Sequence, residues 1–239
     1  MSHEIETLMY TNEVPWHSLG RYVGDNPVTS DEAIVAAGLD WDVELQPLYT
    51  EGMEESSFLG NVTSHKAVTR LLDAKVLGVV GNRYRPVQNA EAFKFMDSLV
   101  EEGLMKYHTA GSLRGGQRVW LLGKVGSFEV VNGDQVDEYV FLWNSHDGSS
   151  GLRCLPTTIR VVCANTANAA LKAGKSTGIS VRHTANVISN LEEAKHILME
   201  SSKSLAQFKE LHKEVKDVTL IQICLIVLQM LCSLILQKE

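Results

Sequence analysis

The sequence predicts an antiparallel α+β fold, in which a β-meander packs with helices and a long C-terminal helical segment follows. Residues 105–163 hold strand-like runs separated by glycine-containing turns, the clearest of which is Gly115-Gly116. Stretches with helical periodicity flank these runs on both sides. The chain has 239 residues, of which 44% are hydrophobic, so it can bury one large core. We expect a core domain with an N-terminal arm over residues 1–188 and a helical segment over residues 189–239.

The first part of the chain is expected to hold an irregular arm, one short helix and three strands. Residues 13–26 are rich in glycine, proline and isolated aromatic residues, which is typical of a loop. Thr29 and Glu32 then have the spacing of a capping box, and Gly38 ends the apolar run that follows, so we expect a helix between them. Apolar residues that alternate or are β-branched predict strands over residues 41–49, 66–72 and 76–80.

Cap and turn residues predict the later elements. Asn89 is a suitable N-cap for a helix that ends at Gly103, and apolar residues recur between them at helical spacing. The other elements expected are a strand over residues 118–125, a helix over residues 164–173 that ends at Gly174, and a strand over residues 179–183.

The C-terminal segment joins a heptad-like helix to an uncharged tail. Ser189 and Glu192 match a capping box, and the apolar residues after them keep a nearly seven-residue rhythm. Residues 218–237 carry no charge. We favour an amphipathic helix that packs against a second copy, which makes the protein a homo-oligomer. The length of the tail also allows a membrane anchor, and its abrupt change in composition allows an altered C-terminus.

Charge is distributed unevenly along the chain. The net charge of −7 argues against wholesale coating of the protein by nucleic acid. Residues 1–105 carry 7 Lys and Arg against 17 Asp and Glu, whereas residues 106–182 carry 9 against 5. Unless this excess of 4 is ordinary scatter, the middle of the chain forms a basic patch on an acidic molecule.

The cysteines and the N-terminus predict a reducing cytoplasm. No CxxC spacing joins the four cysteines, which are Cys154, Cys163, Cys224 and Cys232. The N-terminus lacks a basic start followed by an apolar run and a cleavage site.

No group of residues has the spacing of a known catalytic or metal site. Residues 169–176 resemble a phosphate loop, but a helix is expected before Gly174 and a strand after it, which is the reverse of the order that such a loop requires. His146, Cys154 and Cys163 are separated by eight and nine positions, which matches no common zinc spacing. We expect no catalytic residue, no metal and no cofactor.

Cations alternate with aromatic residues in the meander and after it. This combination holds single-stranded nucleic acid, because cations contact phosphates while aromatic faces stack on bases. On a strand, Arg118, Trp120 and Leu122 share one side, so Trp120 could equally be a core residue under long arginine stems. The residues predicted to bind single-stranded DNA are Arg114, Arg118, Trp120, Lys124, Trp143, Arg153, Arg160, Lys172, Lys175 and Arg182.

Four short runs give the chain a resemblance to a known family. They are PWHSLG over residues 15–20, NRYRPVQN over residues 82–89, SHDGS over residues 145–149 and IRVVCANT over residues 159–166. Together they resemble the phage and plasmid-like family, a domain of unknown function found in phages, plasmids and bacterial chromosomes. The resemblance implies a mobile-element protein in the cytoplasm of a bacterial host cell, and it assigns no catalytic residue.

The order of elements over residues 105–173 is similar to the core of the single-strand annealing proteins that phages use for recombination. This likeness implies a non-enzymatic, oligomeric protein that binds single-stranded DNA. One alternative is a metal-dependent or Cys/His enzyme acting on nucleic acid or nucleotides, with His146, Asp147 and Cys163 in its site. Another is a host-interaction protein without a nucleic-acid role, for which the acidic N-terminal third is suited.

Overall fold

The computed structural model describes residues 3–24, 29–50, 60–129, 135–175 and 178–193, and it confirms a mixed α+β fold. The elements along the chain are β1 (Ile5–Tyr10), β2 (Arg21–Tyr22), α1 (Ser30–Ala36), β3 (Val43–Thr50), β4 (Gly60–Arg70), β5 (Lys75–Gly81), α2 (Asn89–Glu101), β6 (Lys106–Leu113), β7 (Arg118–Glu129), β8 (Gln135–Ser145), β9 (Leu152–Thr157), α3 (Ala164–Ala173) and β10 (Ile179–Val181). Residues 187–193 are also helical.

Seven strands form one large sheet in the order β10-β9-β8-β7-β6-β1-β2. Neighbouring strands are antiparallel except for β1 and β2, which run parallel. The strands β6 to β9 follow one another both in the chain and in the sheet, so the predicted meander is confirmed. β1 is absent from the sequence prediction, and it extends the meander by pairing with β6.

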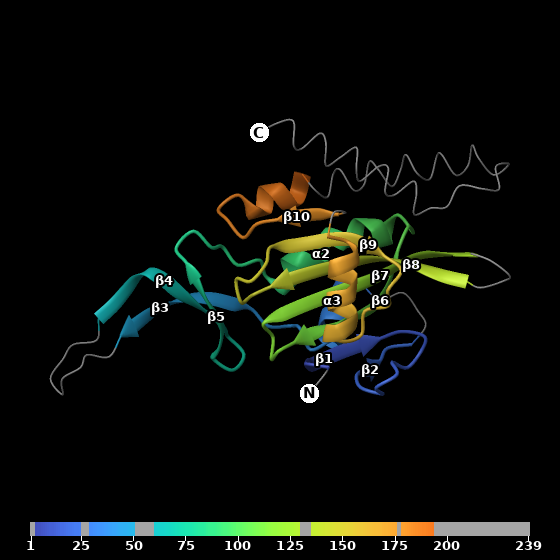
Figure 1. Ribbon diagram of the computed structural model, residues 1–239, viewed down its shortest axis with the longest axis horizontal. Coiled ribbons are helices and arrows are strands. Elements are labelled where there is room, and N and C mark those ends of the chain that lie inside the picture. The colour runs from blue at the N-terminus through green and yellow to red at the C-terminus, as the bar shows by residue number, and fades with distance from the viewer. Residues whose placement is uncertain (1–2, 25–28, 51–59, 130–134, 176–177, 194–239) are drawn as a thin grey trace.

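Both faces of the large sheet are covered, and the side chains of β7 alternate between them. Trp120 and Leu122 pack beneath α3, whereas Val119 and Leu121 join the larger core on the opposite face. Figure 1 shows α3 crossing the strands on one face, and α2 contributes to the core on the other. These faces are called the α3 face and the α2 face below. Burial on both faces explains the unbroken apolar run in β7.

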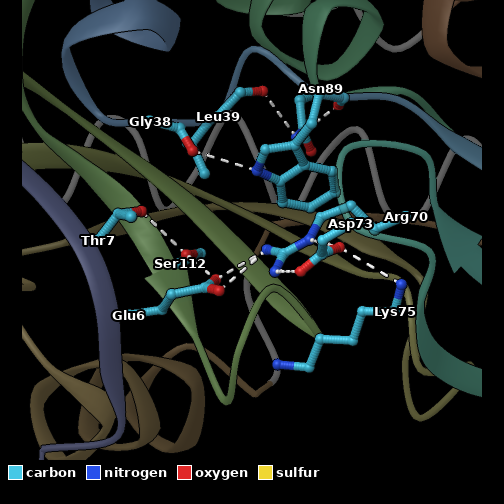
Figure 2. Close-up of polar contacts among 10 residues, drawn as sticks. Glu6, Thr7, Gly38, Leu39, Arg70, Asp73, Lys75, Asn89 and Ser112 are labelled. Carbon is cyan, nitrogen blue, oxygen red and sulfur yellow. Dashed lines mark hydrogen bonds and ion pairs between the residues drawn. The ribbon is translucent and has the colours of Figure 1, made fainter.

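A small sheet of β3, β4 and β5 joins the large sheet through a buried arginine. Arg70 of β4 donates to both carboxylate oxygens of Glu6 on β1, at 3.0 and 3.1 Å, and also pairs with Asp73 (Figure 2). Ser112 of β6 donates to the same Glu6 carboxylate at 2.8 Å. The Arg70 guanidinium also lies over the ring of Trp41, 5.2 Å from its centroid. The Glu6 carboxylate of β1 therefore connects β4 of the small sheet to β6 of the large one.

Two helices end as the sequence predicts. Thr29 caps α1 in a capping box with Glu32, and Gly38 follows the helix with a φ of +64°. α3 ends at Ala173, with Gly174 as its C-cap. Since a helix precedes Gly174 and strand β10 follows it, the order of elements is the predicted one and not that of a phosphate loop.

The start of α2 differs from the prediction. Gln88 is its N-cap, and Asn89 is the first helical residue. The Asn89 side chain points inward, where its amide nitrogen donates to the carbonyl oxygens of Leu39 and Trp41 (Figure 2). Its amide oxygen contacts Nε2 of His146 at 3.0 Å. Asn89 therefore joins three segments of the core and does not cap the helix.

The helix that precedes the C-terminal tail begins at residue 187 and not at Ser189. Val187 and Leu191 are buried in the core on the α2 face. The heptad-like continuation, the uncharged tail and its part in self-association all fall within residues 194–239, which lie outside the described residues. Within the described ranges, no helix has both the length and the apolar character needed to cross a lipid bilayer.

Candidate nucleic-acid interface

Two of the predicted cations lie at the turn between β6 and β7. Arg114 is exposed there, and its Nε donates to Glu4 Oε2 at 2.6 Å. Arg118 begins β7, and its Nη2 lies 3.3 Å from Asp147 Oδ2. The hydrogen bond from Arg114, together with the charges of both arginines, lowers the pKa of Glu4 although burial opposes this. The two guanidinium groups therefore share one environment at this end of the large sheet.

The ring of Trp143 links this turn to β9. Cζ of Arg118 lies 5.9 Å from the Trp143 ring centroid. In the ladder between β8 and β9, Trp143 is the direct partner of Arg153, and direct partners project from the same face of a sheet. Nη2 of Arg153 donates to the carbonyl oxygen of Gly174 at 3.1 Å, at the C-terminus of α3. Arg118 of β7 and Arg153 of β9 thus come from the two strands that flank Trp143 of β8, on the α3 face.

Three further cations lie in the last turn of α3 or after it in the chain. Lys172 lies in its last turn and Lys175 follows its C-cap, and both are exposed, as cations near a helix C-terminus commonly are. Arg182 is exposed directly after β10. It lies beside Gly151, because a Cβ atom placed on Gly151 would be 3.4 Å from the Cα of Arg182. In the part of the chain that the structure describes, none of the three forms an ion pair. The name "cationic end" is used below for Arg114, Arg118, Arg153, Lys172, Lys175 and Arg182.

The remaining two predicted cations lie elsewhere. Lys124 lies further along β7, and on an extended strand it is about 20 Å from Arg118. Its ammonium group pairs with Asp137 at 2.6 Å. Arg160 donates to the backbone carbonyl of Glu13, and its Nη1 lies 3.8 Å from Glu13 Oε2. The structure therefore places six of the predicted cations at the β6–β7 turn, on β9, at the C-terminus of α3 and after β10, and leaves Lys124 and Arg160 outside this group. Their contact with DNA stays a prediction.

The two tryptophans that are predicted to stack on bases are core residues. Trp120 is 1% exposed and Trp143 is 3% exposed. Nε1 of Trp120 donates to Thr109, and Nε1 of Trp143 donates to Ser150, so both indoles also satisfy their polar atom inside the protein. Neither ring is available to a base in this conformation, which corrects the prediction for both. The alternation along β7 places Trp120 on one face of the sheet. Because α3 covers that face, Trp120 is a core residue.

Sequence reasoning misses the carboxylates that accompany the cations. Glu4 is far from Arg114 in the chain, and no local pattern signals their contact. Asp147 is recognisable only as a turn residue, and it does have that role, since it accepts hydrogen bonds from Ser145 and from the backbone of Ser149. Burial raises the pKa of Asp147, but these hydrogen bonds outweigh it and hold the pKa below its ordinary value. A charged carboxylate therefore faces Arg118.

The residues of the enzymatic alternative are not brought together. His146 is fully buried against Trp41, with 5.4 Å between the ring centroids, in the core on the α2 face. Cys163 is buried directly before α3, which covers the other face. Asp147 is held in the turn opposite Arg118. Among the described residues, no group of three or more His, Cys, Asp and Glu side chains is arranged to hold a metal.

The comparison with known proteins relates the chain to one family. The family model for a domain of unknown function, DUF932, matches residues 76–223, which is more than half of the chain. No curated protein and no solved structure matches. The matched range contains the strands β6 to β10, α2, α3 and all residues of the cationic end. The chain therefore belongs to the family of the domain of unknown function DUF932.

Proposed function

We propose that the protein binds single-stranded DNA at the cationic end and promotes strand annealing in recombination or replication. The observation that carries the proposal is the position of Arg118 and Arg153 on the two strands that flank Trp143, with Arg153 bonded to the end of α3, where two lysines are exposed. Arginine and lysine side chains arranged in this way contact successive phosphates. The four runs that resemble phage and plasmid-like proteins support the same proposal.

The cationic end has a positive excess, although the whole protein is acidic. Of its six cations, Arg114 pairs with Glu4 and Arg118 pairs with Asp147 in the described part of the chain. The side chains of Arg114 and Glu4 are 39% and 35% exposed, so their ion pair contributes little and a phosphate can replace the carboxylate. The unpaired lysines at the end of α3 add charge that no described carboxylate offsets.

Burial of the tryptophans limits the proposed contacts to the sugar–phosphate backbone. Phosphate contacts carry no sequence information, so the binding is expected to be independent of sequence. Binding by phosphate contacts also releases counterions, and the affinity therefore falls steeply as salt is added.

We also propose that the protein is a homo-oligomer assembled through residues 189–239. Several cationic ends on one assembly would raise the effective concentration of binding sites along one strand. Light scattering on the full chain over a range of concentrations measures the assembly. A monomer mass at every concentration contradicts this part of the proposal.

Fluorescence anisotropy with a labelled oligothymidylate tests the DNA proposal. The full chain is expected to bind at about 50 mM salt and to lose most of its affinity at about 200 mM salt. The double variant Lys172→Glu/Lys175→Glu should bind more weakly and have a shallower salt dependence, because each lost phosphate contact lowers the slope by about 0.7.

A charge-matched variant controls for the change in net charge. Lys66→Glu/Lys94→Glu alters two exposed lysines on β4 and α2, away from the cationic end, and should bind like the unchanged protein. If the protein fails to bind at low salt, or if both double variants lose the same affinity, the proposal is wrong.

A further inference from the structure

A pocket of about 220 Å³ opens where β1, β6 and β7 meet the end of α2. Polar side chains in its wall come from Thr11, Lys106, His108 and Lys124, and apolar ones from Leu104 and Val125. No residue of the cationic end lines it. The pocket is therefore separate from the surface to which DNA binding is assigned above.

Two β-bulges shape this pocket. The register between β6 and β7 shifts at His108, and the register between β7 and β8 shifts at Val125. A bulge bends its strand and turns a side chain away from the regular ladder, which is why bulges often accompany binding sites. Both bulged residues line the pocket.

His108 is held in place from two sides. Its Nδ1 lies 3.3 Å from the hydroxyl of Thr11, and its ring centroid lies 5.2 Å from that of Tyr139. Burial of the imidazole, with the nearby charges of Arg160 and Lys124, lowers the pKa of His108. The ring is therefore neutral near neutral pH and keeps one N–H group to donate.

Two lysines oppose each other at the pocket. Lys106 and Lys124 are direct partners in the β6–β7 ladder, and like charges in this position repel each other. Asp137 offsets Lys124 at 2.6 Å, whereas Lys106 is exposed and forms no ion pair with any described residue. None of the described residues that line the pocket is acidic. A protein with a net charge of −7 thus keeps an uncompensated positive charge here.

We propose that the pocket binds a phosphate group, either as free phosphate or as a phosphate monoester. A phosphate of charge about −1.5 to −2 between Lys106 and Lys124 would relieve their repulsion. Its oxygens accept several hydrogen bonds at once, which suits two ammonium groups beside the hydrogen-bonded pair of Thr11 and His108. The apolar wall of Leu104 and Val125 is suited to the organic part of a monoester. The proposal does not rest on DNA binding.

Calorimetric titration of the full chain in phosphate-free buffer tests the proposal. The ligands are inorganic phosphate, thymidine 5′-monophosphate and, as the uncharged reference, thymidine. Both phosphates are expected to bind and thymidine is not. Tighter binding of the monophosphate identifies a monoester as the ligand, and equal binding identifies free phosphate. The Lys106→Gln variant should weaken phosphate binding roughly tenfold, because one charge-assisted contact is lost.

Stability measurements separate a binding role of Lys106 from a structural one. Without phosphate, Lys106→Gln should unfold at the same temperature as the unchanged protein or higher, because the repulsion with Lys124 is removed. With phosphate, the unchanged protein should gain more in unfolding temperature than the variant. The control Lys94→Gln, at an exposed position on α2, should retain full phosphate affinity.

Two results overturn the proposal. One is the absence of phosphate binding by the unchanged protein, and the other is equal phosphate affinity of Lys106→Gln and the unchanged protein. The DNA and phosphate proposals can fail separately. Lys106→Gln should keep oligonucleotide binding, while Lys172→Glu/Lys175→Glu should keep phosphate binding.

Discussion

The guanidinium of Arg118 lies over the ring of Trp143, with 5.9 Å between Cζ and the ring centroid. The same group donates to Asp147 and to Ser149, each at 3.3 Å. Arg118 therefore supports the core through Trp143 and presents charge at the surface. The two roles can be separated by substitution.

Arg118→Met keeps an apolar stem over Trp143 but removes the charge and its hydrogen bonds. We expect a loss of about 1–2 kcal/mol in the free energy of unfolding, measured by urea denaturation. Arg21→Met, at an exposed position on β2, is the control and should change stability little. If the two variants are equally stable, the charge of Arg118 and its hydrogen bonds contribute nothing to the fold.

Arg70→Met should be more damaging, because Arg70 is 7% exposed and its loss leaves the half-buried Glu6 carboxylate without its cation. We expect the free energy of unfolding to fall by about 3 kcal/mol in urea denaturation. Asp73→Asn removes the exposed partner of the same arginine and should cost clearly less. Equal losses in the two variants would show that the link between the sheets does not depend on Glu6.

Gly111→Ala tests how closely β1 and β6 approach. A Cβ atom at Gly111 would collide with the backbone oxygen of Thr7 and with the ring of Trp120. Since a backbone atom cannot move aside cheaply, we expect a loss of about 3 kcal/mol in the free energy of unfolding. Gly81→Ala is the matched control, because a Cβ at Gly81 meets nothing within 4 Å. A stable Gly111→Ala protein would contradict the close pairing of β1 with β6.

Acid should unfold the protein through its buried histidines. Burial, with the nearby charge of His183, lowers the pKa of His146 to about 3, and burial lowers the pKa of His183 to about 4. Below the ordinary pKa near 6.5, these histidines bind protons in the unfolded chain, whereas in the folded chain they stay neutral. The free energy of unfolding therefore falls as the pH is lowered. Each histidine should cost about 2 kcal/mol between pH 6.5 and pH 5, and His108 adds in the same direction.

Thermal unfolding at several pH values measures this effect. His183→Asn should reduce the dependence of stability on pH, since one of the buried titrating groups is removed. His65→Asn replaces an exposed histidine on β4 and should leave the dependence unchanged. An unfolding free energy that is constant from pH 7 to pH 5 contradicts the prediction.

Elements whose signals lie within a few residues are predictable from the sequence. The capping box of Thr29 and Glu32 and the stop at Gly174 need only their immediate neighbours, and both are confirmed. β1 is not predictable in this way, because its strand conformation depends on pairing with β6, far along the chain. Asn89 also depends on distant contacts, since the carbonyl groups of Leu39 and Trp41 draw its side chain away from the helix end.

The candidate site is predictable only in part, for the same reason. Its cations can be identified from composition, and six of them lie at the β6–β7 turn, on β9, at the C-terminus of α3 and after β10. The carboxylate of Glu4, the burial of Trp143 and the bulge at His108 depend on how the strands pair and on where α3 lies. Periodicity shows which residues share a side of a strand, but it does not show what covers that side.

Because β1 pairs with β6, the smallest fragment of the chain that is expected to fold by itself must include β1. The family match begins at residue 76, whereas β1 lies at Ile5–Tyr10. A fragment that begins at residue 76 would leave β6 as an edge strand, with a row of backbone N–H and C=O groups open to other molecules. Such a fragment is expected to aggregate. The boundary of sequence similarity is therefore not the boundary of the folding unit.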